Sequence, residues 1–294
     1  MLSLLLTLWM TVLPKGVILV KGATASASDT STPLPENGSV ANGRYRNAYF
    51  GLSYPIPAGW SEQPAGPPPS DGGSYVLAQF ALFGDDGQRV KAHVLVTAQD
   101  LFFALFPGSD ARELVATRGS VVPQYQLESG PEEVTIGGRT FHRLAYSARR
   151  SGLHWRILAT DSRCHAVTFT FTGTDVAALD AAERALGGVS FAADEAAPQC
   201  AKDYARGDNV VASTDPQFTN HRFNTIPVRI VIAADGTVKH VHLLSAFPEQ
   251  SEAILTALRT WRFKPYVVDG KPVEVETGLL FGVPRTAPIA STSK

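Results

Sequence analysis

Residues 226–246 read IPVRIVIAADGTVKHVHLLSA, and this stretch decides the fold of the last part of the chain. Val228, Ile230 and Ile232 recur at every second position, which is the period of a strand with one buried face. The Asp-Gly pair at 235–236 then supplies a tight-turn signal, and a second apolar run follows it. We therefore predict a β-hairpin here.

A helix and one more strand follow the hairpin. Pro248 suits the first position of a helix, because that position has no intrahelical partner for an N–H. Apolar residues then recur at i, i+3, i+4 and i+7 on one helical face: Ile254, Ala257, Leu258 and Trp261. Pro265 ends the helix, and residues 273–279 largely alternate between apolar and polar side chains. Residues 226–283 are therefore predicted to form a small β-β-α-β domain.

The residues of this domain resemble the C-terminal domain of TonB-type energy transducers. The resemblance is carried by IPVRI at 226–230, DGTV at 235–238, Ser245, ALR at 257–259, WRFKP at 261–265 and DGKPV at 269–273. It implies a periplasmic module that pairs, by strand addition, with a short segment of an outer-membrane receptor. The long Pro-rich spacer and the receptor-contacting motif of full transducers are not recognised in the sequence. We therefore expect a binding or adaptor protein, linked to TonB-dependent transport, rather than one that delivers force.

Strand addition would use the free edge of the last strand, which we place at residues 273–281. The side chains expected to contact the partner are Arg229, Lys239, Val273, Val275, Glu276, Leu279 and Phe281. We expect structural roles for Trp261, Phe263 and Pro265, although the two aromatic side chains could also contact a partner. The alternative function is self-association through the same edge, which would make the chain a structural or assembly protein of the envelope.

Residues 44–193 predict a second, larger domain of the α+β class. Three pairs of β-rich runs, each joined by a short turn, lie at 75–97, 134–148 and 154–172, and helical patterns cover 110–118 and 175–186. This order predicts an antiparallel sheet accompanied by two helices. The opening phrase YFGLSY at 49–54 and the closing phrase VSF at 189–191 resemble PsbP/Mog1-like domains, which implies a ligand- or partner-binding role.

The N-terminus predicts export. An apolar run at 2–13 is followed by two small-x-small cleavage patterns, Ala23-Thr-Ala25 and Ala25-Ser-Ala27, so residues 1–27 are predicted to be a signal peptide. Because no Lys or Arg precedes the run, the alternative is a segment that stays uncleaved. The remaining segments are a flexible lead-in at 28–43, a linker at 194–225 and a disordered tail at 284–294.

The chain contains two cysteines, Cys164 and Cys200, which agrees with export to the periplasm or cell envelope. An even count in an oxidising compartment predicts a disulfide between them, and two buried thiols are the alternative.

Composition and motifs argue against several other functions. The formal net charge of −1 does not suit a nucleic-acid binder, which needs a basic face to neutralise phosphates. His240 and His242 lie two positions apart on one strand face without an apparent third ligand, so we expect no metal site. His165 follows Cys164, but a disulfide would remove the nucleophile of that pair. No nucleophile-elbow, zinc-protease, Walker or Rossmann pattern occurs, and we expect neither an enzyme nor a cofactor.

Overall fold

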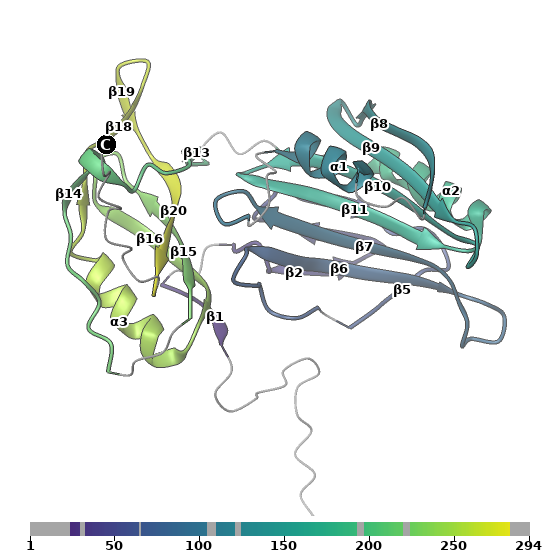
Figure 1. The fold of residues 1–294 in the computed structure, drawn as a ribbon, viewed down its shortest axis with the longest axis horizontal. Coiled ribbons are helices and arrows are strands. Elements are labelled where there is room, and N and C mark those ends of the chain that lie inside the picture. The colour runs from purple at the N-terminus through teal and green to yellow at the C-terminus, as the bar shows by residue number, and fades with distance from the viewer. Residues whose placement is uncertain are drawn as a thin grey trace, which may run out of the picture.

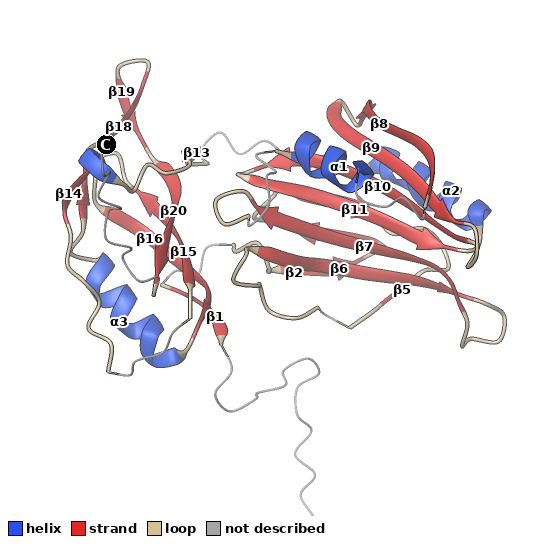
Figure 2. Cartoon of the chain, viewed as in Figure 1, coloured by secondary structure: helices blue, strands red, loops and turns tan. Residues whose placement is uncertain are grey.

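The structure is a computed structural model that describes residues 24–29, 33–64, 66–104, 110–120, 125–192, 197–219 and 224–282. The described chain forms two α+β regions that lie side by side, and Figure 1 shows the larger one on the right. We call them the N-terminal domain (33–192) and the C-terminal domain (197–282). Strands dominate both regions, as Figure 2 shows, so the predicted α+β class is confirmed.

The N-terminal domain is built on a seven-stranded antiparallel sheet. Its strands, in spatial order, are β5 (Ser61–Glu62), β6 (Ser74–Phe83), β7 (Val90–Asp100), β11 (His165–Gly173), β10 (Leu153–Ser162), β9 (Arg139–Ala148) and β8 (Gln126–Ile136). All three hairpins predicted from the sequence are present in it. Arg163 and Cys164, which join β10 to β11, both have positive φ (46° and 58°) and make a tight two-residue turn. That turn faces the C-terminal domain.

Different elements pack on the two faces of this sheet. One face packs against helix α2 (Val176–Ala185) and a four-stranded sheet, and the large aromatic core of the domain lies between them. The strands of the four-stranded sheet are β12 (Ser190–Phe191), β4 (Leu52–Pro55), β3 (Arg44–Asn47) and β2 (Gly38–Ala41). The opposite face packs against helix α1 (Ala111–Ser120) through a smaller cluster around Val115 and Leu144.

The C-terminal domain carries the β-β-α-β pattern predicted from the sequence. Its five-stranded sheet has the order β1 (Ala25–Ser28), β16 (Val238–Ala246), β15 (Ile226–Ile232), β20 (Val275–Phe281) and β13 (Gln199–Cys200). Helix α3 (Pro248–Leu258) lies on the face directed away from the N-terminal domain (Figure 1). Two small ribbons complete it: β14 (Val210–Ala212) with β17 (Arg262–Phe263), and β18 (Tyr266–Val268) with β19 (Lys271–Val273).

Two segments differ from their prediction. The segment 28–43, expected to be a flexible lead-in, contributes the end of β1 and the whole of β2. The segment 194–225, expected to be a linker, contributes β13, a short 3₁₀ turn at Gly207–Asn209 and β14, all packed on the C-terminal domain. Both segments are held at strand edges by main-chain hydrogen bonds. A polar, turn-rich sequence can make such bonds as well as an apolar sequence can.

Parts of the predicted organisation lie outside the described residues. These are positions 1–23 of the signal peptide and the tail at 284–294. Among the residues that the structure describes, no helix combines the length and apolar character needed to cross a membrane.

Candidate functional site

Within the described part of the chain, the interface between the two domains brings together the buried charged side chains of Asp100, Arg229 and Glu276. Side chains on β15 alternate between the two faces of the sheet. Val228 and Ile230 pack beneath α3, whereas Arg229 points to the N-terminal domain. Leu244 on β16 packs in the core of the N-terminal domain itself. The C-terminal sheet is therefore buried on both faces.

Arg229 is the centre of this interface and is 2% exposed. Its Nη1 lies 2.5 Å from Oδ2 of Asp100, at the end of β7. Its Nε donates to Oε1 of Glu276 on β20 at 3.1 Å, and its Nη2 donates to the hydroxyl of Tyr49 at 3.2 Å. The Tyr49 hydroxyl in turn donates to Oε1 of Glu276 at 3.1 Å. One guanidinium thus joins two carboxylates and a phenol from both domains.

One face of the Arg229 guanidinium packs against an aromatic ring. Its guanidinium carbon lies 4.6 Å from the ring centroid of Phe102, which is a cation–π distance. Gly278 is the cross-strand neighbour of Arg229, and a Cβ added there would come within 2.8–2.9 Å of Phe102 and Phe103. Glycine is needed at position 278 because the two phenylalanines approach the backbone of β20 so closely.

The pKa shifts at the interface follow from burial and neighbouring charge. Burial lowers the pKa of Arg229, but Asp100 and Glu276 outweigh it, so that pKa stays well above its usual value. Burial raises the pKa of Tyr49 and keeps the phenol protonated. Burial, aided by the charge of Arg229, lowers the pKa of His165 well below its usual value. The Nδ1 of this neutral ring lies 2.7 Å from a backbone carbonyl, so Nδ1 carries the proton.

A cavity of about 250 Å³ opens beside this network. The charged and aromatic residues in its wall are Tyr49, Arg163, Arg229, Lys239, His240, His242, Glu274 and Glu276. Lys239 pairs with Glu274 at 2.6 Å, and the guanidinium of Arg163 lies 4.1 Å from the ring centroid of Tyr49. Among the described residues that line the cavity there is no Ser, Thr or Cys to act as a nucleophile. The paired charges in its wall join strands of the C-terminal domain to one another and to the N-terminal domain.

The two strand histidines lie in different surroundings. His240 is half-buried, whereas His242 is buried with its Nε2 3.0 Å from the Ser26 hydroxyl and 3.1 Å from Oε1 of Glu36. Both oxygens meet the same ring nitrogen, so this is not the relay of a nucleophilic triad, which uses both nitrogens. Burial raises the pKa of Glu36, but the bonds from His242 and Ser26 outweigh it and lower that pKa. No group of three metal-ligating side chains comes together in the described part of the chain.

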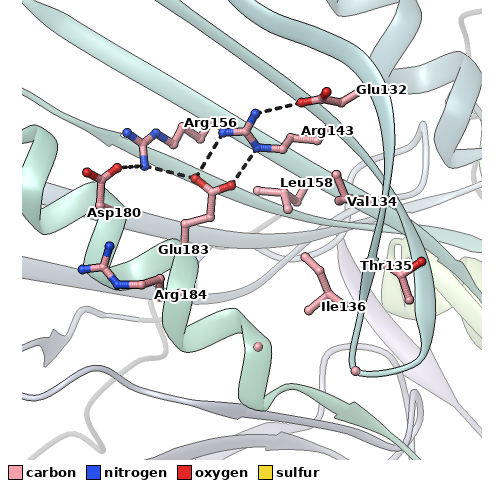
Figure 3. Close-up of a pocket in the computed structure, with 12 residues that line it drawn as sticks. Glu132, Val134, Thr135, Ile136, Arg143, Arg156, Leu158, Asp180, Glu183 and Arg184 are labelled. Carbon is pink, nitrogen blue, oxygen red and sulfur yellow. Dashed lines mark hydrogen bonds and ion pairs between the residues drawn. The ribbon is translucent and has the colours of Figure 1, made fainter.

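A larger cavity, of about 590 Å³, lies between α2 and the β8–β9 hairpin (Figure 3). Arg143 donates to Glu183 at 2.7 Å and to Glu132 at 2.9 Å. Arg156 bridges Glu183 and Asp180 on the helix. These charges pair with one another between helix and sheet, so we assign the cluster a structural role in fastening α2.

The structure corrects the expected roles of several side chains in partner binding. Arg229, Val275, Glu276 and Leu279 are buried within this chain, because β15 and β20 are covered on both faces. Their side chains therefore cannot set partner preferences. Val273 lies on β19 and not on the last strand. Of the remaining residues expected to contact a partner, Lys239 is exposed and Phe281 is half-buried.

The edge of β20 is partly occupied. β13 runs parallel to β20 and pairs Gln199 with Val275 and Cys200 with Glu276. Cys200 forms a disulfide with Cys164 in the β10–β11 turn, with a Cα–Cα distance of 5.8 Å. The predicted bridge is therefore present, and it links β13, the neighbour of β20, to the N-terminal domain.

Two of the three expected structural residues are buried, but Trp261, predicted on the apolar stripe of the helix, lies beyond the end of α3 at Leu258, so Pro265 does not end the helix. Trp261 is buried and its Nε1 donates to the carbonyl of Thr214 at 2.9 Å. Phe263 is buried with its ring centroid 5.9 Å from that of Trp261. Pro265 is exposed between β17 and β18, where it separates two strands rather than packing in a core.

Several residues of the interface were not identified from the sequence. Asp100, Tyr49, His165 and Arg163 all come from the N-terminal domain, far from Arg229 along the chain. One signal was available: Arg229 is the only charged residue in the run IPVRIVI, and a buried strand face rarely carries an unpaired arginine. That signal indicates a buried partner without saying which residue it is.

Comparisons with known proteins address each domain separately. The chain is similar to the solution structure of cyanobacterial PsbP (CyanoP) from Synechocystis sp. PCC 6803, at 14% identity and a TM-score of 0.36, covering 53% of this chain and 99% of that one. It is also similar to LpqN of Mycobacterium tuberculosis, a protein involved in cell envelope biogenesis, at 13% identity and a TM-score of 0.33, covering 57% and 92%. The N-terminal region carries both likenesses, and no function is transferred from them. No curated protein matches the chain significantly.

The C-terminal match is of a different kind. Residues 222–281 match the family described as Gram-negative bacterial TonB protein C-terminal. This family is typical of a domain that contacts envelope proteins, and the disulfide agrees with an oxidising compartment such as the periplasm. The recognised family therefore accounts for about a fifth of the chain, at residues 222–281, where the sequence resembles the C-terminal domain of TonB proteins.

Proposed function

We propose that this chain is an exported cell-envelope binding or adaptor protein without enzymatic activity, and that its TonB-like domain binds a protein partner by strand addition. The match at residues 222–281 and the disulfide support a role in the envelope. The buried charges in the interface are paired with one another within the chain, and this pairing favours binding over catalysis.

The open part of the β20 edge carries the proposal. The amides of Gln199 and Ala201 donate to the carbonyls of Glu274 and Glu276 at 2.9 and 3.1 Å. Even-numbered residues of β20 thus direct their backbone groups to this edge, and by the two-residue period Gly278, which is buried, and Leu280, which is exposed, do the same. β13 ends opposite Glu276, and within the described ranges no further strand pairs with the edge beyond it.

The chemistry of this edge indicates the kind of partner. Main-chain hydrogen bonds make few demands on sequence, so the partner is an extended segment of another envelope protein. Leu280 is 44% exposed beside the open edge and offers an apolar contact to an alternate residue of that segment. The resemblance to TonB makes a segment of an outer-membrane receptor the first candidate, with a role in TonB-dependent transport.

The experiment compares two substitutions at one exposed position. Leu280→Pro removes an outward-pointing N–H donor, and proline is tolerated where the missing donor faces an open edge. Leu280→Ala removes the side chain but keeps the donor. In pull-downs from envelope fractions, we expect the partner to be lost with Leu280→Pro and retained with Leu280→Ala. Equal capture by wild type and Leu280→Pro would refute strand addition here.

The same variants distinguish the alternative function, self-association, from the adaptor role. If the edge serves self-association, sedimentation velocity at rising concentration shows a dimer that Leu280→Pro abolishes. A tight dimer of this kind occupies the edge and leaves no room for a receptor segment. A wild-type chain that stays monomeric while binding an envelope protein supports the adaptor role.

A further inference from the structure

The opposite edge of the C-terminal sheet is closed by the start of the described chain. β1 pairs antiparallel with β16, so that Ala25 lies opposite Ala246 and Ser28 lies opposite His242. This strand overlaps the two small-x-small patterns that predict signal cleavage. The contacts of its residues distinguish the two possible cleavage positions.

The side-chain contacts that distinguish the two positions begin at Ser26. The Ser26 hydroxyl donates to Oε1 of Glu36 at 2.5 Å and lies 3.0 Å from Nε2 of His242. Ala27 packs against the core beneath α3. Ala25, by contrast, is exposed.

The contacts continue past Ala27. The Ser28 hydroxyl donates to the carbonyl of Val241 at 3.1 Å, and the amide of Asp29 donates to the same carbonyl at 3.2 Å. The Asp29 carboxylate accepts from the Val241 amide at 2.9 Å. Cleavage after Ala27 would remove the contacts of Ser26 and Ala27, whereas cleavage after Ala25 would keep every contact named here except the pairing of Ala25.

We propose that the exported chain is cleaved between Ala25 and Ser26, and that the new N-terminal ammonium of Ser26 docks beside the Glu36 carboxylate. An endopeptidase that reads small residues catalyses hydrolysis of this peptide bond. Water supplies the hydroxyl that makes Ala25 a carboxylate and the hydrogen that makes Ser26 an amine. An α-amino group has a pKa of about 7.7–8.0, so it is mostly protonated near neutral pH.

The site already has a place for such a cation. Oε2 of Glu36 is buried and has no hydrogen-bond partner in the described structure, while Oε1 is taken by Ser26 and His242. A buried carboxylate oxygen left unpaired is costly, and the ammonium of Ser26, a residue whose hydroxyl already bonds to this carboxylate, would offer it a charged donor. Processing would thus complete the site rather than disturb it.

This placement also has a consequence for partner binding. The processed terminus covers the β16 edge along Val241–Ala246 and leaves the β20 edge for an incoming strand. The inference rests on the export part of the proposed function. The test therefore separates failure of export from failure of the cleavage position.

N-terminal sequencing of the chain recovered from the periplasm is the first test, and we expect it to begin at Ser26. A chain that begins at Ser28, or at any other processed position, overturns this inference and leaves export intact. A chain that begins at Met1 contradicts both.

The second test measures the reactivity of the new amine. In a chain that begins at Ser26, we expect Glu36→Gln to raise the rate of N-terminal labelling by an amine-reactive reagent several-fold. Glu252→Gln, on the exposed face of α3, should leave that rate unchanged. Equal labelling rates in wild type and Glu36→Gln would show that the ammonium is not docked at Glu36.

Discussion

Arg229 and Asp100 form a buried ion pair in which Nη1 of the arginine lies 2.5 Å from Oδ2 of the aspartate. The pair joins the middle of the C-terminal sheet to the end of β7 in the N-terminal domain, and their exposed fractions are 2% and 0%. Removing one member of such a pair leaves the other charge without a counterion in a medium of low dielectric constant. The pair is therefore the buried ionic link between the two domains, beside the Cys164–Cys200 disulfide and the packing of Leu244.

Arg229→Met should lower the free energy of unfolding by about 3–5 kcal/mol, because Asp100 and Glu276 lose their common cation. Denaturant titration measures the loss. Arg206→Met is the control: its pair with Asp203 is exposed, and the change should stay within about 0.5 kcal/mol. Adding Asp100→Asn to Arg229→Met should recover part of the loss. Similar small effects in both arginine variants would show that the buried ion pair of Arg229 and Asp100 does not stabilise the chain.

Stability should fall as the pH drops below about 6.5, the usual pKa of histidine, because of His165. Burial holds the folded-state pKa of His165 well below that value, so the unfolded chain takes up a proton that the folded chain does not. The unfolded state is then favoured as the pH falls, and the effect vanishes above the unfolded pKa. Unfolding measured at several pH values should show this slope.

His165→Asn is the matched variant for that slope, because its amide can still donate to the carbonyl of Arg163. The variant should show a flatter dependence between the same pH values. Some slope should remain, since burial also lowers the pKa of His93. A variant with the slope of the wild type would place the titrating group elsewhere.

Reducing the disulfide, or replacing both cysteines with serine, should destabilise the chain by about 3–4 kcal/mol for a sequence separation of 36 residues. It should also free β13 from the edge of β20. Hydrogen exchange at the amides of Gln199 and Ala201 should then become faster, while the β8–β9 hairpin keeps its protection. Unchanged exchange at the two amides would show that the disulfide does not hold β13 in place.

Reducing the disulfide should also change how tightly the chain binds its partner, because it frees the edge of β20. With β13 released, Glu274 and Glu276 would offer their carbonyls to a partner strand in addition to Gly278 and Leu280. We expect the partner identified by pull-down to bind the reduced chain more tightly. Weaker binding after reduction would mean that β13 belongs to the binding surface.

Gly278→Ala should lower the free energy of unfolding by about 1–3 kcal/mol through overpacking, because the new methyl group would press on Phe102 and Phe103. Gly187→Ala is the control, since nothing lies within 4 Å of its added carbon and its φ is not positive. Thermal unfolding of both variants checks the prediction. An equal effect would mean that the interface is looser than the contact distances indicate.

Short-range sequence patterns were sufficient to predict the local elements of secondary structure. The hairpin around Gly236, helix α3 and the three hairpins of the N-terminal domain could be predicted because strand period, helix period and turn residues act within a few positions. The disulfide was predictable for a simpler reason, since two cysteines in an exported chain allow one pairing.

Only the tertiary structure decided the site. Arg229 meets Asp100 and Tyr49 across 129 and 180 positions of the chain, a distance over which sequence periodicity carries no information. β1 and β13 were missed for a related reason: edge strands are held by main-chain groups that any sequence supplies, so their pairing depends on which edge lies nearby. The sequence by itself determined the local elements, and the packing of the two domains determined which charges are buried and which edge of the sheet stays open.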